Sequence, residues 1–278
     1  MKEVLTTTRN EQAQYYAVLS IRKIFINHSR SLPFATKSEF RDFFLQLLIS
    51  DQLPPNTLKA VMQGLAEIMI LKWIEDSSNN QVEFKTVAAM SERNLIQVLS
   101  TYESIVNEVN EGTIKLITRS KRTKFKDNFM CEILAFAFTT LNNLVASYKN
   151  EATPLLSSVL SLIHTCFSFN FIEPEEDTEY NQIPITWSYI ILDKKLIKPI
   201  FEIASGNFNE QLKVLALRIA GPLSGIQSYF FIDSKARRKY YKHIFPFIFS
   251  ILNKVNINLY KELLNFFYNF SVYLLVDY

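Results

Sequence analysis

Hydrophobic residues recur along most of the chain at intervals of three, four and seven, the spacing of one face of an α-helix. Between residues 56 and 74 this apolar stripe consists of Leu58, Val61, Leu65, Ile68 and Met69. No strict alternation of apolar and polar residues, the mark of a half-buried strand, interrupts the pattern. The chain is therefore predicted to be all-α, with helices at about 11–27, 37–50, 56–74, 91–109, 127–148, 154–169, 194–205, 208–220, 234–253 and 256–276.

The predicted helices combine into a repeat when they are taken in pairs. A unit of about 40 residues is typical of helical hairpins of the HEAT and armadillo type, which stack into an α-solenoid. Many of the helices are apolar over more than half of their circumference, as expected of helices packed between neighbouring repeats. We expect residues 1–278 to form a single array of about five hairpins, at 11–50, 56–109, 127–169, 187–220 and 234–276.

The last predicted helix is apolar where a solenoid normally ends in a polar face. Leu259, Leu263, Phe266, Phe270 and Leu274 recur there at helical spacing. An exposed apolar face of this kind favours association with another molecule. We expect self-association or a partner contact through this helix, or a chain that is a fragment of a longer array.

Composition excludes several classes of protein. Hydrophobic residues make up 48% of the chain, which argues against disorder, and there are only five glycines, which argues against glycine-rich phosphate loops. The formal charge of +3 carries no nucleic-acid signature. The uncharged run 155–172 is near the length of a membrane span, but its several serines, His164, Thr165 and Asn170 favour a buried helix of a soluble protein. The two cysteines, Cys131 and Cys166, lie in apolar runs and are expected to be reduced, as in intracellular proteins.

Motifs of catalysis and of phosphate binding are absent from the sequence. It contains no G-x-S-x-G, G-x-x-x-x-G-K-[ST] or G-x-G-x-x-G segment. The histidines His28, His164 and His243 are far apart in sequence, and His164 lies two positions from Cys166, on a different face of a helix. We therefore predict no enzyme activity, no catalytic or metal-binding residue and no cofactor.

A strongly acidic stretch follows the helix predicted at 154–169. Its carboxylates are Glu173, Glu175, Glu176, Asp177 and Glu179. It lacks the glycine that makes the sharp turn of a calcium loop, and a solvated loop does not supply the pocket that paired catalytic carboxylates need. Residues 173–183 are predicted to be a loop between two repeats.

A basic stretch, RSKRTKFK, covers residues 119–126. One interpretation is a nuclear-localisation-like or nucleic-acid patch. The favoured one is a solvated linker before a helix, because Phe125 alone makes no stacking platform for bases.

The two charged stretches are predicted to be neighbours. In an antiparallel hairpin the start of helix 127–148 and the end of helix 154–169 lie at the same end, so Lys121 and Glu176 are expected to be close. The candidate partner-binding residues are therefore Lys121, Arg122, Lys124, Glu175, Glu176 and Asp177.

The residues around the acidic stretch carry a resemblance to a known family. A helix ending in Phe169 and Phe171 is followed by the acids and by the return Gln-Ile-Pro-x-x-Trp, residues 182–187. This arrangement resembles the exportin seven group, which includes the Ran-binding proteins sixteen and seventeen, within the importin-β (karyopherin) family. Weaker similarities in the same order extend over about residues 15–255, at Leu71-Lys72-Trp73, Asn107-Glu108-Val109-Asn110, Phe125-Lys126-Asp127 and Gln227-Ser228-Tyr229-Phe230.

The resemblance implies a nucleocytoplasmic transport receptor of the exportin type. Such a protein binds the GTPase Ran in its GTP form, cargo proteins and nuclear pore proteins, and it shuttles between nucleus and cytoplasm without direct contact with nucleic acid or membrane. Family members are several times longer than this chain, which resembles a portion from about the second repeat to about the sixth. The alternative is a HEAT-repeat scaffold that binds other proteins and no longer binds Ran.

Overall fold

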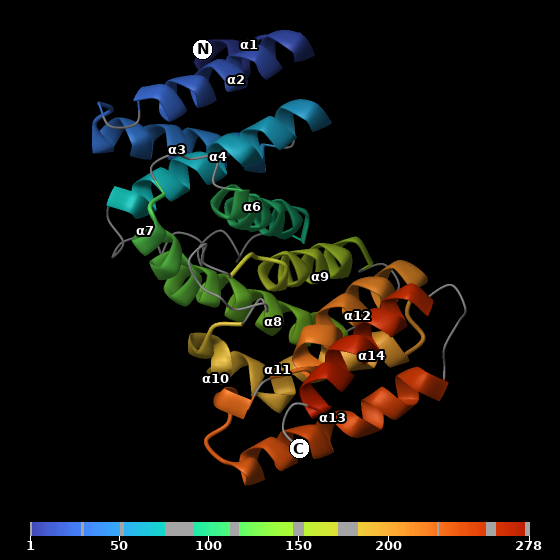
Figure 1. Cartoon of the computed structure of the whole chain (residues 1–278). Helices are drawn as coiled ribbons and strands as arrows, with labels where there is room; N and C mark the ends of the chain where they lie inside the picture. Colours follow the sequence, from blue (N-terminus) through green and yellow to red (C-terminus); the bar gives the residue numbers. More distant parts are fainter. Residues whose placement is uncertain are drawn as a thin grey trace. The chain divides into compact units, whose positions relative to one another are not determined.

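The computed structural model describes residues 2–28, 31–50, 53–75, 92–111, 117–146, 153–171, 183–226, 228–253 and 260–275. All regular structure within these ranges is helical (Figure 1), which confirms the all-α prediction. Stacking of the helices into an α-solenoid, and the hairpin boundaries, stay predictions. The chain divides into two compact units, Met1–Phe125 and Lys126–Tyr278, and each is described by itself.

The first unit is built around one helix that is buried on nearly all sides. Helix α4 is the packing partner of three other helices of the unit, α2, α3 and α6. Its residues from Ala60 to Trp73 are buried apart from Met62 and Gln63, as expected of an apolar core helix. The helices of this unit are α1 (Lys2–Thr7), α2 (Glu11–His28), α3 (Phe34–Ile49), α4 (Pro55–Glu75), α6 (Glu92–Glu111) and α7 (Arg119–Lys124).

The second unit has two helices, α11 and α12, at its centre. Helix α11 packs on α8, α12 and α13, while α12 packs on α9, α11 and α14. The longer helices of this unit are α8 (Met130–Ala146), α9 (Thr153–Phe167), α11 (Lys194–Ser205), α12 (Glu210–Ser224), α13 (Ser234–Asn253) and α14 (Tyr260–Leu275). The short ones are η3 (Ile185–Trp187), α10 (Ser188–Ile191) and η4 (Ser228–Phe230).

Polar caps mark the start of both central helices. The carboxylate of Asp193 accepts a hydrogen bond from the backbone N–H of Lys195 at 2.8 Å. The side chain of Asn209 accepts one from the N–H of Leu212 at 2.9 Å. Each bond satisfies a donor that the first turn of a helix leaves without a partner. The cap at Asn209 places the start of α12 at Glu210, two residues after the predicted start at 208.

The basic stretch differs from its prediction. Residues 119–124 are helical, and a π-helical turn, η1 (Phe125–Phe129), joins them without a break to α8. Asp127 therefore lies inside a continuous helical segment and not at its first turn. The reason is burial: Phe125 is 1% exposed and contacts Trp73 edge-on, with ring centroids 5.6 Å apart. A buried ring gives the basic segment an anchor that a solvated linker lacks.

The apolar runs also differ from expectation in length. Helix α9 ends at Phe167, so it does not extend over the whole run 155–172. By length and composition, the one described helix that could cross a membrane is Arg119–Ala146. Within its most apolar stretch of 18 residues, 44% is buried inside the protein. A core helix of a soluble protein meets the same criterion.

Candidate functional site

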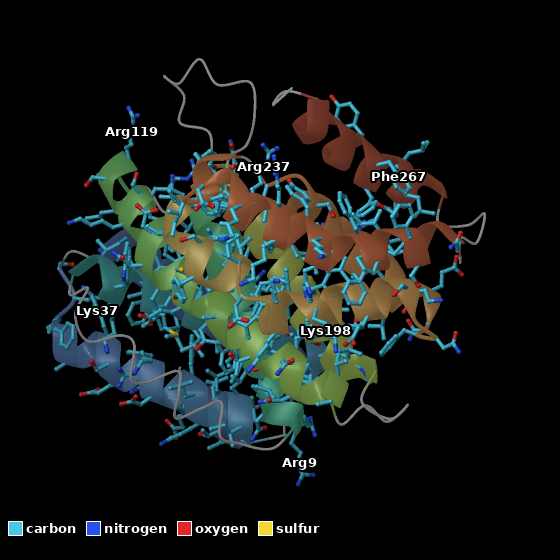
Figure 2. All side chains as sticks on the ribbon, turned by 90° about the horizontal axis from the view of Figure 1, so that it is seen from below. Arg9, Lys37, Arg119, Lys198, Arg237 and Phe267 are labelled. Atoms are coloured by element: carbon cyan, nitrogen blue, oxygen red, sulfur yellow. The ribbon has the colours of Figure 1, made fainter. Side chains whose placement is uncertain are left out.

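Two of the three predicted basic contact residues are partly covered. Lys121 and Arg122 on α7 are half-buried, whereas Lys124 is exposed. A guanidinium nitrogen of Arg122 donates to the side-chain oxygen of Asn110 at 3.4 Å, which ties α7 to the last turns of α6. Figure 2 shows Arg119 extending outward from the first turn of the same helix. Helix α7 is therefore held against α6 in the first unit while its cations remain at least partly exposed to solvent.

The predicted acidic contact residues, Glu175, Glu176 and Asp177, lie outside the described residues. The proximity of Lys121 and Glu176 accordingly stays a prediction.

The aromatic anchors on either side of the acidic stretch come together in the second unit. Trp187 is fully buried and contacts the rings of Phe167 and Phe171 edge-on, at centroid distances of 6.0 and 5.3 Å. Its indole N–H donates to the backbone carbonyl of Lys126 at 3.1 Å. The hydroxyl of Tyr229 donates to the carbonyl of Ile183 at 2.9 Å. The return to Trp187 is thus held at a defined position by two distant parts of the chain.

A groove of about 590 Å³ lies between α2 and the start of α4 in the first unit. Its wall contains Glu11, Tyr15, Asn56, Lys59 and Gln63 among others. The N–H groups of the first turn of α4 have no partner within the helix, and Pro55 stands at the first helical position, where its missing N–H is not needed. Side chains that donate hydrogen bonds and side chains that accept them both line the groove, which suits contact with the side chains of a protein partner.

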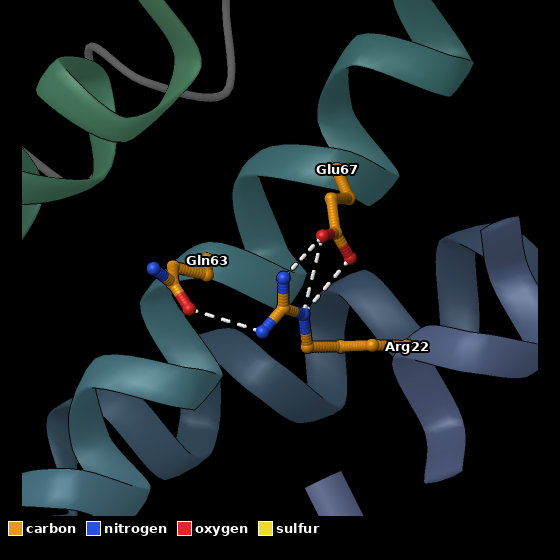
Figure 3. Close-up of polar contacts among 3 residues, drawn as sticks. All are labelled: Arg22, Gln63 and Glu67. Carbon is orange, nitrogen blue, oxygen red and sulfur yellow. Dashed lines mark hydrogen bonds and ion pairs between the residues drawn. The ribbon is translucent and has the colours of Figure 1, made fainter. Parts of the chain in front are cut away.

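A buried ion pair fixes the helices behind this groove (Figure 3). Arg22 on α2 forms an ion pair with Glu67 on α4, and its other terminal nitrogen donates to the side-chain oxygen of Gln63 at 3.0 Å. The Glu67 side chain is 3% exposed. The hydrogen bond with Glu67 is the main cause that raises the pKa of Arg22. Because the guanidinium neutralises this carboxylate, the pair holds two helices together and does not provide an acid or base for catalysis.

Close approach of the helices at this point requires Gly64. A Cβ at that position would lie 2.7 Å from a ring carbon of Phe44 and 2.9 Å from the Cγ of Arg22. Gly64, the glycine of α4, thus lies where this helix meets α3 and α2, because it has no side chain to keep them apart.

A further cationic region, which the sequence analysis did not identify, joins residues 45 positions apart in the second unit. The ammonium group of Lys194 on α11 donates to the backbone carbonyl of Lys239 on α13 at 3.4 Å. This contact brings Lys194 and Lys195 beside the basic first half of α13, SKARRKYYKH. Figure 2 labels Lys198 and Arg237 on the two helices. The only signal in the sequence was the basic run in α13, because the contribution of α11 depends on packing.

Two residues of the apolar stripe predicted on the last helix, Leu263 and Phe266, pack inward. Leu263 and Phe266 are 5% and 1% exposed, and α14 lies on α12. Leu264 and Tyr268 are exposed instead. The side chains from Asn269 onward lie outside the described residues, so self-association through this helix stays a prediction.

No metal centre is formed by the residues that the structure describes: nowhere among them do three His, Cys, Asp or Glu side chains gather in a suitable group. Cys131 and Cys166 are both buried free thiols, and burial is the main cause that raises the pKa of Cys131.

Comparison with known proteins identifies relatives of the chain. No family model matches it. It is 24% identical over 215 residues to Exportin-7-A of Xenopus laevis, covering 69% of this chain and 19% of that protein. It is 24% identical over 225 residues to Ran-binding protein 16 of Drosophila melanogaster, covering 72% of this chain and 20% of that protein. The chain thus spans about a fifth of the length of these relatives. The chain is distantly related to exportin-7 and Ran-binding protein 16 over about 70% of its length.

Proposed function

We propose that the chain acts as a nucleocytoplasmic transport receptor of the exportin type that binds Ran in its GTP form. The observation that carries the proposal is the relation to both Exportin-7 and Ran-binding protein 16, spread over about 70% of the chain. The all-helical fold is compatible with such a role. The relatives are transport receptors and not enzymes, so we propose a binding protein without catalytic residues.

The partners that this function requires are Ran, cargo proteins and nuclear pore proteins, and the chain would move between nucleus and cytoplasm. Within the first unit, Lys121, Arg122 and Lys124 on α7 are the proposed basic contacts. Glu175, Glu176 and Asp177 are the proposed acidic contacts. Their charges attract a partner of complementary charge and speed its encounter.

Retention of the purified chain by immobilised Ran tests the proposal. Ran loaded with a non-hydrolysable GTP analogue is expected to retain the chain, and Ran loaded with GDP is not. The double substitution Lys121→Glu/Lys124→Glu should weaken retention, while Lys23→Glu, an exposed position on α2, serves as the matched control. Equal retention by the two nucleotide forms, or none by either, contradicts dependence on Ran.

A second candidate function is a helical scaffold that binds proteins without Ran. The observation that favours it is the length of the match, because the chain spans only about a fifth of the length of each relative. Capture of partners that is unchanged when Ran is removed or loaded with GDP would favour the scaffold. Capture that depends on the nucleotide bound to Ran would favour the receptor.

A further inference from the structure

One face of α13 carries cations in its first half and aromatic residues in its second. Exposed positions recur every three or four residues along this helix, so they share a single stripe. The opposite side holds Tyr240, Tyr241, Ile244 and Ile248, which are buried. We call the exposed stripe the α13 face, and it consists of Lys235, Arg238, Lys239, Lys242, Phe245, Pro246 and Phe249.

The cations of the α13 face have no carboxylate partner among the residues that the structure describes. Lys235, Arg238, Lys239 and Lys242 form no ion pair within the described part of the chain. The nearby carboxylate of Asp233 is used as a helix cap, since it accepts the N–H of Ala236 at 2.6 Å. Four like charges on about two turns of helix repel one another, and an anionic partner relieves that repulsion.

Helix α11 extends this positive field. The ammonium group of Lys194 contacts the backbone carbonyl of Lys239. Desolvation by burial is the main cause that lowers the pKa of His243 on α13, and the positive charge of Lys194 lowers it further. Lys198 is the exception, because it forms an ion pair with Glu202 at 2.9 Å.

The second half of the α13 face is apolar although it points to solvent. Phe249 is 63% exposed and Phe245 is 36% exposed. Pro246 lies between them inside the helix and has no N–H, so the carbonyl of Lys242 lacks its usual bond from residue 246. A backbone acceptor is therefore available where the cations end and the aromatic rings begin. Exposed aromatic rings beside cations have the composition of protein interfaces.

We propose that the α13 face binds an acidic amphipathic segment of another protein, with carboxylates over the cations and apolar side chains over Phe245 and Phe249. From Lys235 to Phe249 the face extends about 21 Å along the helix axis, which is the length of about four helical turns. A single partner helix or extended segment can cover it.

The order of the residues along the axis favours a linear segment over two other polyanions. Proteins that bind single-stranded nucleic acid typically interleave aromatic rings with cations, so that bases stack between phosphate contacts. Here both rings lie beyond the last cation. A membrane-surface helix carries its cations and its apolar residues on different faces. On α13 they share one face, so a helix lying flat would bury cations as deeply as phenylalanines.

Fluorescence anisotropy with a labelled synthetic peptide tests the proposal on the full chain. The probe is a peptide of about 16 residues with glutamates in one half and leucines at helical spacing in the other. Lys235→Glu/Arg238→Glu is expected to raise the Kd at least about tenfold, and Phe249→Ser about fivefold. Added salt should weaken binding by wild type and by Phe249→Ser, but have little effect on the charge-reversed variant.

Matched controls separate the α13 face from general effects of charge or exposed apolar area. Lys23→Glu and Tyr16→Ser change exposed residues of the first unit and should leave the Kd unchanged; Tyr16 is 65% exposed. A peptide with glutamines in place of the glutamates should bind at least about tenfold more weakly.

Three outcomes overturn the proposal. The first is that the α13 variants bind as wild type does while retaining its thermal unfolding curve. The second is that the control variants lose binding equally. The third is that single-stranded DNA or phosphatidylserine vesicles bind more tightly than the peptide and depend on the cations alone. None of these measurements involves Ran, so failure here leaves the proposed transport function intact.

Discussion

The indole N–H of Trp187 donates a hydrogen bond to the backbone carbonyl of Lys126 at 3.1 Å, across 61 positions of sequence. Lys126 lies in the π-helical turn η1, and its carbonyl is thereby bonded by a side chain. Phe167 and Phe171 contact the same indole edge-on. One buried side chain therefore connects the start of the second unit, the end of α9 and the chain that returns from the acidic stretch.

Replacing Trp187 should separate its hydrogen bond from its packing. Trp187→Phe removes the donor and takes this bond from the partly buried carbonyl of Lys126, at a cost of about 1–3 kcal/mol in the free energy of unfolding. Trp187→Ala also opens a cavity and should cost about 3–5 kcal/mol. Urea denaturation followed by circular dichroism measures both. Ile185→Ala, at a position that is 56% exposed, is the control and should have little effect. Equal stability of wild type and Trp187→Phe would show that the hydrogen bond contributes nothing.

Removing one member of the buried ion pair should destabilise the first unit. Glu67→Leu leaves the guanidinium of Arg22 without its main partner, and such a loss typically costs about 3–5 kcal/mol. The double variant Arg22→Met/Glu67→Leu removes the uncompensated charge as well and should recover most of this stability. Denaturant midpoints of the two variants provide the measurement. Glu202→Gln breaks the exposed pair with Lys198 and should change stability by about 0.5 kcal/mol or less. A double variant no more stable than the single one would contradict the assignment.

Gly64→Ala should destabilise the protein although alanine is the better helix former. The propensity gain is about 1 kcal/mol. Against it stands the overlap of the new Cβ with Phe44 and Arg22, at 2.7 and 2.9 Å. Overpacking of this kind typically costs about 1–3 kcal/mol, so a net loss is expected in thermal or denaturant unfolding. Adding Phe44→Leu makes room and should restore part of the loss. An increase in stability for Gly64→Ala alone would show that the helices separate without cost.

Stability in acid should depend on the pair formed by Arg218 and Glu262, whose nearest oxygen and nitrogen are 2.8 Å apart. The hydrogen bond from Arg218 is the main cause that lowers the pKa of Glu262 below its ordinary value of 4.5. A lowered pKa in the folded state means that the pair stabilises the protein above about pH 4.5. That contribution disappears as the pH falls through the folded value. Arg218 is 44% exposed, so water screens the pair and its contribution is about 0–1 kcal/mol.

The free energy of unfolding of wild type and of Arg218→Ala, determined at two pH values, measures this contribution. At pH 6 the variant should be slightly less stable, and near pH 3 the difference should vanish. A difference of the same size at both pH values would assign it to lost packing of the arginine stem and not to charge.

Helix positions followed closely from local patterns. Helices α11 and α13 have the bounds that the periodicity predicts, Lys194–Ser205 and Ser234–Asn253. The capping side chain of Asp193 and the pair Pro54-Pro55 act within one turn of the helices that they start. Signals of this kind depend on neighbouring residues alone, so they can be recognised in a linear sequence.

The basic stretch was misjudged because its conformation depends on a distant contact. Seven of the eight residues in RSKRTKFK are charged or hydroxylated, which suits a solvated linker, yet Phe125 is buried against Trp73, more than 50 positions away. Burial of that ring supports a helix that polarity alone does not predict.

The periodicity of apolar residues specified an all-helical chain and most helix bounds, and the Phe-rich turn with its return to Trp187 indicated the relation to the exportin-7 group. Tertiary packing decided which surfaces a partner can meet. It turned Leu263 and Phe266 inward onto α12, and it brought Lys194 of α11 beside the cations of α13. The physical reason is that helical periodicity depends on neighbours within one or two turns. A binding surface depends instead on which faces of distant helices are covered when they pack.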